Sequence, residues 1–276
     1  RDEIAKELRE LATDIEGYLA ILGDRVKLYA VMREELEAID AEFSTPRICE
    51  IAPAWDGLED EDLMEREDMV VTVTHGGYIK RTALATFRAQ NRGGKGRAGM
   101  ATKDEDAVTE LFVTSTHTPV LFFSTHGKVY RMKVWRLPEG GPQTRGRPMI
   151  NLLPLAEGET ISTVLPLPED EAEWGNLHVM FATAKGSVRR NSMDAFTNVP
   201  SNGKIAMKFE GEDADDRLIG VALLTEEDDV LLASRQGKAI RFEGTDIREF
   251  QSRNSTGVRG MKLAKGDEVI SLSILT

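Results

Sequence analysis

A loop rich in glycine and basic residues holds the side chains best suited to chemistry in this sequence. It reads Gln90-Asn91-Arg92-Gly93-Gly94-Lys95-Gly96-Arg97. Successive glycines leave backbone N–H groups free to line an anion site, and the neighbouring cations favour phosphate. Gly94, Gly96 and Gly99 also fit the G-x-G-x-x-G pattern of dinucleotide sites. The loop follows a polar stretch without a βαβ unit, however, so the pattern favours phosphate contact over a nucleotide site.

The elements around this loop belong to a repeat. Four times, an apolar strand runs into a tight turn and then into a second strand; the turn glycines are Gly77, Gly127, Gly186 and Gly237, spaced 50, 59 and 51 residues apart. Glycine supplies the positive φ that such hairpin turns need. After each hairpin come a second glycine, close to a methionine, and then a further apolar strand. Each repeat of ~50 residues therefore offers about four strands, as a propeller blade does. We expect blades at 69–115, 117–166, 177–224 and 228–276.

Charge is segregated within the repeats. The windows 75–100, 125–150, 184–209 and 235–262 hold 24 of the 27 basic residues of positions 69–276 and only 5 of the 26 acidic ones. If the repeats are arranged radially, the basic windows lie on one rim and predict a continuous cationic belt. Such a belt suits the phosphate backbone of duplex DNA. Its few aromatic residues argue against a stacking platform for single strands.

The first 68 residues differ in character. Residues 1–43 are predicted to form an antiparallel α-helical hairpin, because apolar residues recur at spacings of three and four: Ile4, Leu8, Leu11, Ile15, Leu19 and Leu22, then Val26, Tyr29, Met32, Leu36, Ile39 and Phe43. Isolated helices need tertiary burial, so we expect the two apolar stripes to pack together. The alternative is a coiled coil that extends upstream. Residues 44–68 are expected to form a short strand and an acidic linker.

Composition sets limits on function. The net charge of −12 alone would argue against nucleic-acid binding, but residues 1–68 contribute −13 and residues 69–276 contribute +1. No apolar run approaches the ~20 residues that span a bilayer. The single cysteine, Cys49, excludes an internal disulfide framework and a cysteine-rich zinc site, and it fits a cytoplasmic protein. We expect no catalytic residues, no metal site and no cofactor in this chain.

Residues 90–96 resemble the glycine–arginine box in the C-terminal DNA-wrapping domain of DNA gyrase A, the A-type component of a type IIA topoisomerase. The common form of the box has arginine at the second position, where this chain has Asn91. The four repeats resemble the same domain along residues 69–276, and residues 1–43 resemble the end of the coiled-coil arm that precedes it. The box distinguishes gyrase from the related component of topoisomerase IV, in which it is degenerate or missing.

The resemblance implies a mostly β fold, a propeller-like β-pinwheel with about four blades present here. It implies binding and wrapping of duplex DNA, so that an ATP-dependent holoenzyme introduces negative supercoils. ATP and Mg²⁺ belong to other regions of that holoenzyme. The implied partners are duplex DNA, gyrase B and a second gyrase A chain in an A2B2 assembly, in the cytoplasm at the nucleoid, with no membrane. The family's catalytic tyrosine follows an arginine, and none of the four tyrosines here does.

The expected DNA-binding residues combine the box with basic residues of all four repeats. They are Gln90, Arg92, Gly93, Gly94, Lys95, Gly96, Arg97, Lys80, Arg81, Lys128, Arg131, Arg145, Arg147, Arg189, Arg190, Lys204, Lys238, Arg241 and Arg259. Two alternatives stay open: a propeller-type scaffold for protein interactions, and the C-terminal domain of the related A-type component of topoisomerase IV.

Overall fold

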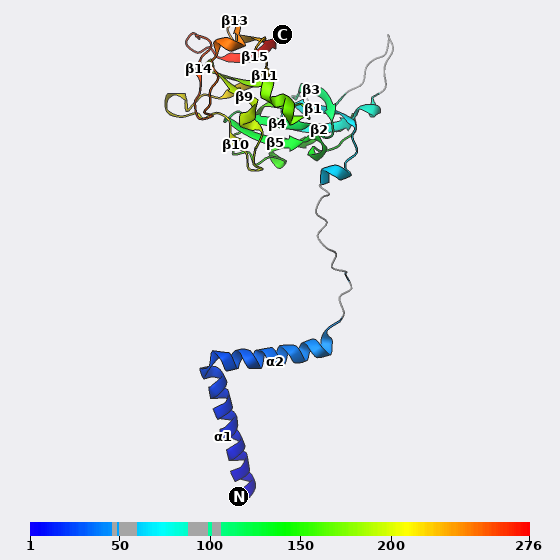
Figure 1. The fold of residues 1–276 in the computed structure, drawn as a ribbon, viewed down its shortest axis with the longest axis vertical. Helices are drawn as coiled ribbons and strands as arrows, with labels where there is room; N and C mark the ends of the chain where they lie inside the picture. The colour runs from blue at the N-terminus through cyan, green and yellow to red at the C-terminus, as the bar shows by residue number, and fades with distance from the viewer. Residues whose placement is uncertain (46–48, 50–59, 88–98, 101–105) are drawn as a thin grey trace. The chain divides into compact units, whose positions relative to one another are not determined.

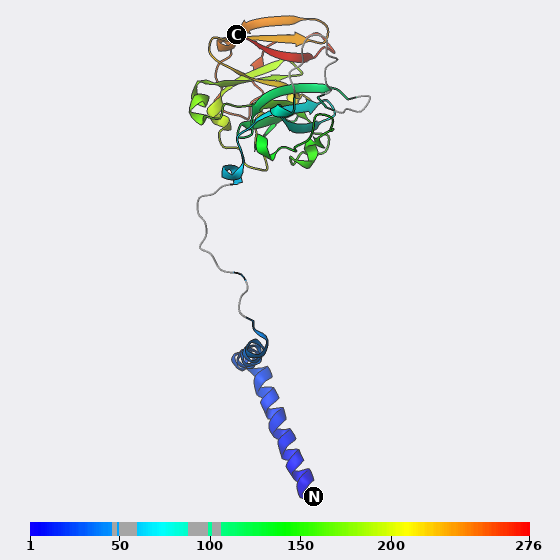
Figure 2. The ribbon, with the colours of Figure 1, turned by 90° about the vertical axis from the view of Figure 1, so that its right-hand side faces the viewer.

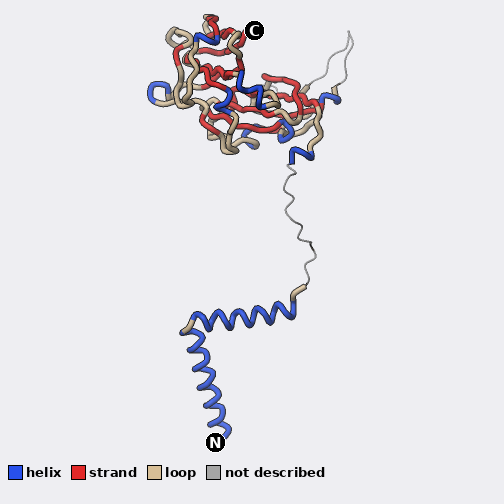
Figure 3. Tube along the Cα trace, in the orientation of Figure 1, coloured by secondary structure: helices blue, strands red, loops and turns tan. Residues whose placement is uncertain are grey.

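The structure is a computed structural model that describes residues 1–45, 49, 60–87, 99–100 and 106–276. The chain divides into two units, Arg1–Gly57 and Leu58–Thr276, which we call the helical unit and the β unit. Figure 3 shows the contrast between them: long helices in the first, strands joined by loops and short helices in the second. The predicted mostly β fold, with four propeller-like sheets preceded by two helices, is confirmed.

The helical unit contains α1 (Asp2–Gly23) and α2 (Arg25–Phe43). The side chain of Asp24 caps α2 by accepting a hydrogen bond from the Val26 N–H, 2.9 Å away. The predicted packing of one apolar stripe on the other is not found. The two helices meet at an angle (Figure 1), and neither of these fully described helices has a buried side chain. Leu22 beside the turn, for example, is 79% exposed.

Four antiparallel sheets make up the β unit (Figures 1 and 2). The first has the order β3-β1-β2-β6, with β1 (Asp68–Thr74), β2 (Tyr78–Ala83), β3 (Val108–Ser115) and β6 (Arg147–Pro148). The second is β10-β5-β4-β7, with β4 (Pro119–Ser124), β5 (Lys128–Lys133), β7 (Ile161–Pro166) and β10 (Lys204–Ile205). The third is β11-β8-β9-β14, with β8 (His178–Thr183), β9 (Ser187–Ser192), β11 (Leu218–Leu224) and β14 (Val258–Arg259). The fourth is β13-β12-β15, with β12 (Asp229–Ser234), β13 (Ala239–Glu243) and β15 (Val269–Leu275).

The fourth strand of each four-stranded sheet comes from the following repeat, which the sequence did not predict. We call β6, β10 and β14 the straps. Each strap is two residues long and pairs with the second hairpin strand of the preceding sheet, as β6 does with β2. The closing strand β11 lies against both of the other closing strands, β7 and β15. The straps therefore occupy the opposite, outer edge of each sheet.

Short helices connect the strands and the core lies between the sheets. The 3-10 helices are η1 (Asp60–Leu63), η2 (Leu84–Thr86), η3 (Val134–Arg136), η4 (Met149–Asn151), η5 (Glu171–Asn176), η6 (Met193–Phe196), η7 (Gly211–Asp213) and η8 (Gly244–Asp246). The methionine that follows each strap is buried: Met149, Met207 and Met261. One cluster joins the second and third sheets through Phe123 and Phe181, whose rings meet edge to face at 5.6 Å. Burial of these side chains supplies the main stabilisation of the β unit.

Candidate nucleic-acid interface

Each strap reaches the sheet it joins through a glycine in the left-handed region. Gly146, Gly203 and Gly257 have φ values of 80°, 84° and 100°. A Cβ on Gly146 would collide with the carbonyl group of Ile79, and the other two glycines are similarly enclosed. Only glycine permits this close approach together with positive φ. The glycines thereby fix the basic residues that follow them along the outer edge.

Exposed basic side chains gather on the straps and beside the hairpin turns. Arg147 on β6 and Arg259 on β14 are exposed, and Lys204 on β10 is half-buried. Lys128 begins β5 and is half-buried, whereas Lys238 lies exposed just after the last hairpin turn. Within the described residues, the side chains of Arg147, Lys238 and Arg259 make no hydrogen bond or ion pair. These three cations are the best placed to meet a phosphate.

A second set of basic residues occupies one register position in all four sheets. Arg81, Arg131, Arg190 and Arg241 lie opposite Val71, Leu121, Met180 and Leu231 of the neighbouring strand. The repeats therefore place these arginines at equivalent positions and do not scatter them over unrelated faces. Their availability for DNA depends on which acceptors they already bind.

Two of these arginines are largely committed within the protein. Arg81 donates from Nε to the carbonyl of Leu137 at 2.9 Å and forms an ion pair with Glu139 at 3.0 Å. Arg131 pairs with Glu171 at 2.5 Å and stacks over a buried tryptophan ring. Both side chains are mostly buried. They connect the sheet to the loops of the next repeat and leave little donor capacity for DNA.

The other two members of the set differ. Arg241 is exposed and forms an ion pair with Asp229, its nearby neighbour on the adjoining strand. Arg190 is only 8% exposed, and its Nε and one terminal nitrogen have no partner in the described part of the chain. Glu249, which forms a β-bridge with Arg190, pairs with His178 at 3.3 Å. Arg241 keeps access to solvent, whereas Arg190 does not.

Lys80 is buried, contrary to its expected place in the DNA-binding set. Its side chain is fully enclosed, and Nζ donates to three backbone carbonyls, those of Gly141, Pro142 and Thr144, at 2.8, 3.0 and 3.0 Å. Burial lowers the pKa of this amine below its ordinary value. All three carbonyls belong to the loop that leads into the strap β6. Lys80 therefore holds a strap in place and is out of reach of a phosphate.

Arg189 has the same role in the third sheet. It is fully buried and stacks over the ring of Phe181, 4.8 Å from its centroid. Its acceptors are the side chain of Asn191 and the carbonyls of Arg253, Ser255 and Ala206. Burial, together with the neighbouring Arg253 charge, lowers the pKa of Arg189 to about 10. We therefore remove Lys80, Arg189 and the buried Arg190 from the DNA-binding set.

Lys204 and Arg145 are intermediate cases. Lys204 donates from Nζ to the carbonyls of Ala195 and Asn198, both at 3.0 Å. Partial burial and a nearby arginine lower the pKa of Lys204. Arg145 stacks on the Tyr78 ring with its guanidinium carbon 3.8 Å from the centroid. Lys204 lies on the strap β10 and Arg145 just before the strap β6, and both side chains keep part of their surface in solvent.

The glycine–arginine box falls outside the described residues. The expected DNA-contacting residues Gln90, Arg92, Gly93, Gly94, Lys95 and Gly96 of the box, and Arg97 directly after it, all lie there. In sequence, Gly96-Arg97 occupies the place in the first repeat that Gly146-Arg147 occupies in the second. Their assignment to DNA contact stays a prediction.

Three carboxylates that the sequence analysis missed secure the hairpin turns. Asp106, Asp216 and Asp267 each precede a closing strand and accept a backbone N–H from a turn, donated by Gly76, Lys185 and Gln236 at 2.7, 3.0 and 3.0 Å. Partial desolvation opposes ionisation, but hydrogen bonds outweigh it and lower the pKa of Asp106 and Asp267. Aspartate recurring just before the closing strand was the signal that could have identified them.

The described residues offer neither a metal-ligand cluster nor a membrane-spanning helix. Within the described ranges, no three His, Cys, Asp or Glu side chains come together as metal ligands do. No helix in those ranges has the length and apolarity to cross a bilayer. The basic outer edge is thus the most distinctive chemical feature of the β unit.

Comparison with known proteins shows the family. A profile described as "DNA gyrase C-terminal domain, beta-propeller" matches residues 68–115, 118–168, 177–224 and 228–276. The DNA gyrase A protein of Rickettsia bellii is 50% identical over 275 residues, and that of Granulibacter bethesdensis is 52% identical over 277. Each match covers 100% of this chain, but the chain spans only 30% and 29% of those relatives.

Solved structures have the same fold. A C-terminal domain of DNA topoisomerase IV has a TM-score of 0.63 at 24% identity, covering 77% of this chain and 62% of its own. A DNA gyrase A C-terminal domain has a TM-score of 0.57 at 25% identity, covering 75% of this chain and 64% of its own. Each of the four matched repeats supplies three strands of one sheet, and this chain therefore belongs to the DNA gyrase C-terminal domain family of β-propellers.

Proposed function

We propose that the β unit binds duplex DNA along its outer edge and bends it, as the DNA-wrapping part of a gyrase A protein. The observation that supports this most is the recurrence, at three of the four sheets, of exposed basic side chains that make no ion pair within the described residues. Arg147, Lys238 and Arg259 lie at three different sheets: Arg147 and Arg259 are on straps of the first and third sheets, and Lys238 follows the hairpin turn of the fourth. A curved row of cations follows a bent phosphate backbone without reading bases.

Electrostatics can offset the cost of bending. Bending 20–30 bp of duplex by 40–90° costs on the order of 1–6 kcal/mol. Each neutralised phosphate releases condensed counterions, which makes log affinity fall with log salt at about −0.9 per phosphate. The outer edge offers several such contacts, and the box residues Arg92, Lys95 and Arg97 add three cations. The box also favours gyrase over topoisomerase IV.

The remaining steps of the reaction are assigned to the rest of the enzyme. We place ATP and Mg²⁺ with gyrase B or with other regions of gyrase A, in an A2B2 assembly that introduces negative supercoils. This chain supplies no catalytic residue to that reaction and acts by directing DNA. Its proposed place of work is the cytoplasm, at the nucleoid.

Binding and bending of a labelled duplex by the 276-residue chain test the proposal. We expect affinity to fall steeply between about 50 and 200 mM salt. Energy transfer between the duplex ends should rise on binding. Replacing Arg92, Lys95 and Arg97 with alanine should reduce bending. Absent or salt-independent binding would contradict the proposal and favour the protein-interaction scaffold.

A further inference from the structure

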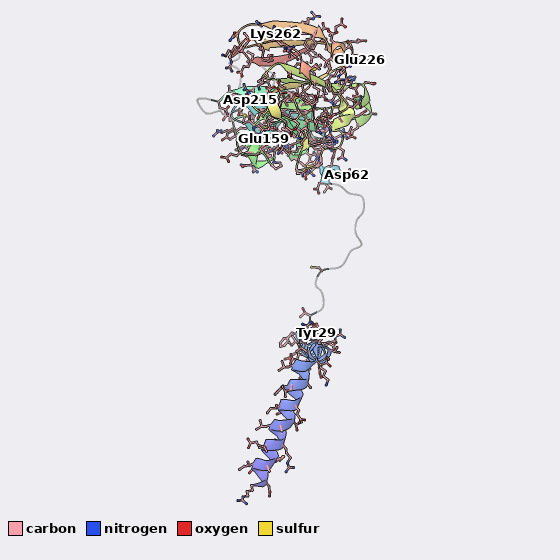
Figure 4. All side chains as sticks on the ribbon, turned by 90° about the vertical axis from the view of Figure 1, so that its left-hand side faces the viewer. Tyr29, Asp62, Glu159, Asp215, Glu226 and Lys262 are labelled. Atoms are coloured by element: carbon pink, nitrogen blue, oxygen red, sulfur yellow. The ribbon has the colours of Figure 1, made fainter. Side chains whose placement is uncertain are left out.

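An acidic segment of the β unit lies beside a cationic groove on the second sheet. Residues 60–68 contain six carboxylates and one arginine. The segment starts with η1, and Figure 4 shows Asp62 where this short helix joins the sheets. Acidic and basic side chains therefore meet on a unit whose proposed function depends on its cations.

Main-chain groups of this segment hold it in place. The buried Thr116 hydroxyl donates to the Glu65 carbonyl at 2.8 Å, and the Thr116 N–H donates to the Glu67 carbonyl at 2.9 Å. The buried His117 ring lies 3.3 Å from the Glu61 carbonyl. All three contacts use carbonyls of the segment and none of its carboxylates. Neutralising acidic side chains of residues 60–62 therefore leaves these anchoring contacts intact.

The groove holds a direct pairing of one of these carboxylates with a cation of the sheet. The groove has a volume of about 610 Å³, and its lining includes Asp60, Glu61, Arg131, Lys133, Trp135 and Arg136. Glu61 pairs with Lys133 at 3.0 Å, and both side chains are less than one-third exposed. Arg136 is exposed over the Trp135 ring. A carboxylate thus already neutralises Lys133, while the neighbouring Arg136 stays exposed.

We propose that residues 60–62 act as a built-in phosphate mimic that competes with DNA for the groove of the second sheet. The inference rests on the proposed DNA-binding function. With the segment seated, Lys133 is neutralised and the carboxylates repel an approaching backbone. Displacing the segment frees Lys133 beside the exposed Arg136 and extends the basic outer edge. The acidic segment thereby sets how tightly and how far DNA is wrapped.

The test compares two double neutralisations in the 276-residue chain. One variant is Asp60→Asn with Glu61→Gln. The matched control is Glu226→Gln with Glu227→Gln, exposed residues between β11 and β12 that Figure 4 places at another part of the β unit. Both change net charge by the same amount. We expect the first variant to bind duplex DNA about fivefold more tightly near 100 mM salt, with a salt slope steeper by about one.

The control should change affinity less than about twofold and leave the slope unaltered. Equal effects of the two variants, or none, would overturn the proposal. Lys133→Gln provides a second test. In the Glu61→Gln background it should abolish the gain in affinity for duplex DNA. In the wild type, where Glu61 already neutralises Lys133, the same substitution should cost less affinity. Equal loss in both backgrounds would contradict competition. If the wild type itself does not bind DNA, the proposed function fails; a wild type that binds without this difference refutes only the mimic.

Discussion

Lys80 and Arg189 differ from Arg147 and Arg259 in what they bind, although each of the four lies in one of the four basic windows of the sequence. The first pair is buried and donates to backbone carbonyls of the loops that carry the straps. The second pair is exposed and unpaired within the described residues. Position decides the difference: Lys80 and Arg189 lie three residues after a turn glycine, whereas Arg147 and Arg259 lie on the straps. One pair builds the outer edge, and the other presents charge on it.

Replacing Arg189 should give the largest effect. Arg189→Met keeps much of the buried volume but leaves three backbone carbonyls and the Asn191 side chain without their donor. We expect a loss of about 3 kcal/mol or more of stability. That corresponds to a fall in Tm of about 6–12 °C for a domain of this size. A Tm within about 2 °C of the wild type would show that this buried charge does not hold the strap.

Lys80→Met and Lys238→Met make the same substitution at a buried lysine that holds a strap and at an exposed lysine proposed to contact DNA. Lys80→Met should lower stability by about 2 kcal/mol and leave the salt slope of DNA binding unchanged in the folded protein. Lys238→Met should stay within about 0.5 kcal/mol of the wild type and reduce the salt slope by about one. Thermal unfolding and binding titrations measure both quantities. Similar changes in stability and salt slope for the two variants would show that the buried and exposed lysines do not have different roles.

Gly146→Ala tests whether the strap positions its basic residue. Alanine would adopt the left-handed region under strain and collide with the Ile79 carbonyl, so we expect a loss of about 1–3 kcal/mol and weaker DNA binding through Arg147. Gly158→Ala is the matched control, because its φ is also positive but its Cβ would meet open space. Equal effects of the two variants on DNA affinity would show that the strap does not position Arg147 for DNA.

The smallest effect concerns the carboxylates at the hairpin turns. The folded-state pKa of Asp106 lies below its ordinary value of 3.8, so its contribution to stability is present above that pH and is lost as pH falls through the lowered pKa. Asp106→Asn should lower Tm at neutral pH and flatten the acid dependence below about pH 4. Glu226→Gln should do neither. If Asp106→Asn keeps the Tm and the acid dependence of the wild type, the Asp106 carboxylate does not stabilise the hairpin turn.

The hairpins and their turn glycines were predictable because strand patterns and glycine turns are local. Gly77, Gly127, Gly186 and Gly237 all have positive φ in the structure. The straps were not predictable, since β6, β10 and β14 are two residues long and pair with a different repeat. Pairing across repeats leaves no period in so short a segment. The apolar stripes of the two helices in residues 1–43 were predictable from their spacing. Amphipathicity alone, however, does not identify the surface against which such a stripe packs.

The cationic belt was predictable as a charge pattern and not as a set of accessible side chains. Lys80 and Arg147 carry the same charge and lie in basic windows, yet only the fold shows that one faces backbone carbonyls and the other solvent. Arg131 likewise looked available until Glu171, 40 residues away in sequence, proved to be its partner. Contacts between repeats decide burial, and no local pattern encodes them.

The most direct test of the account is the salt dependence of duplex binding by the triple variant Arg147→Gln, Lys238→Gln and Arg259→Gln. These residues lie at three different sheets, and their side chains make no hydrogen bond or ion pair among the described residues. We predict a salt slope smaller by about three, at about 0.9 per lost phosphate contact, with Tm unchanged. An unchanged slope in the folded triple variant would contradict the claim that the outer edge binds DNA.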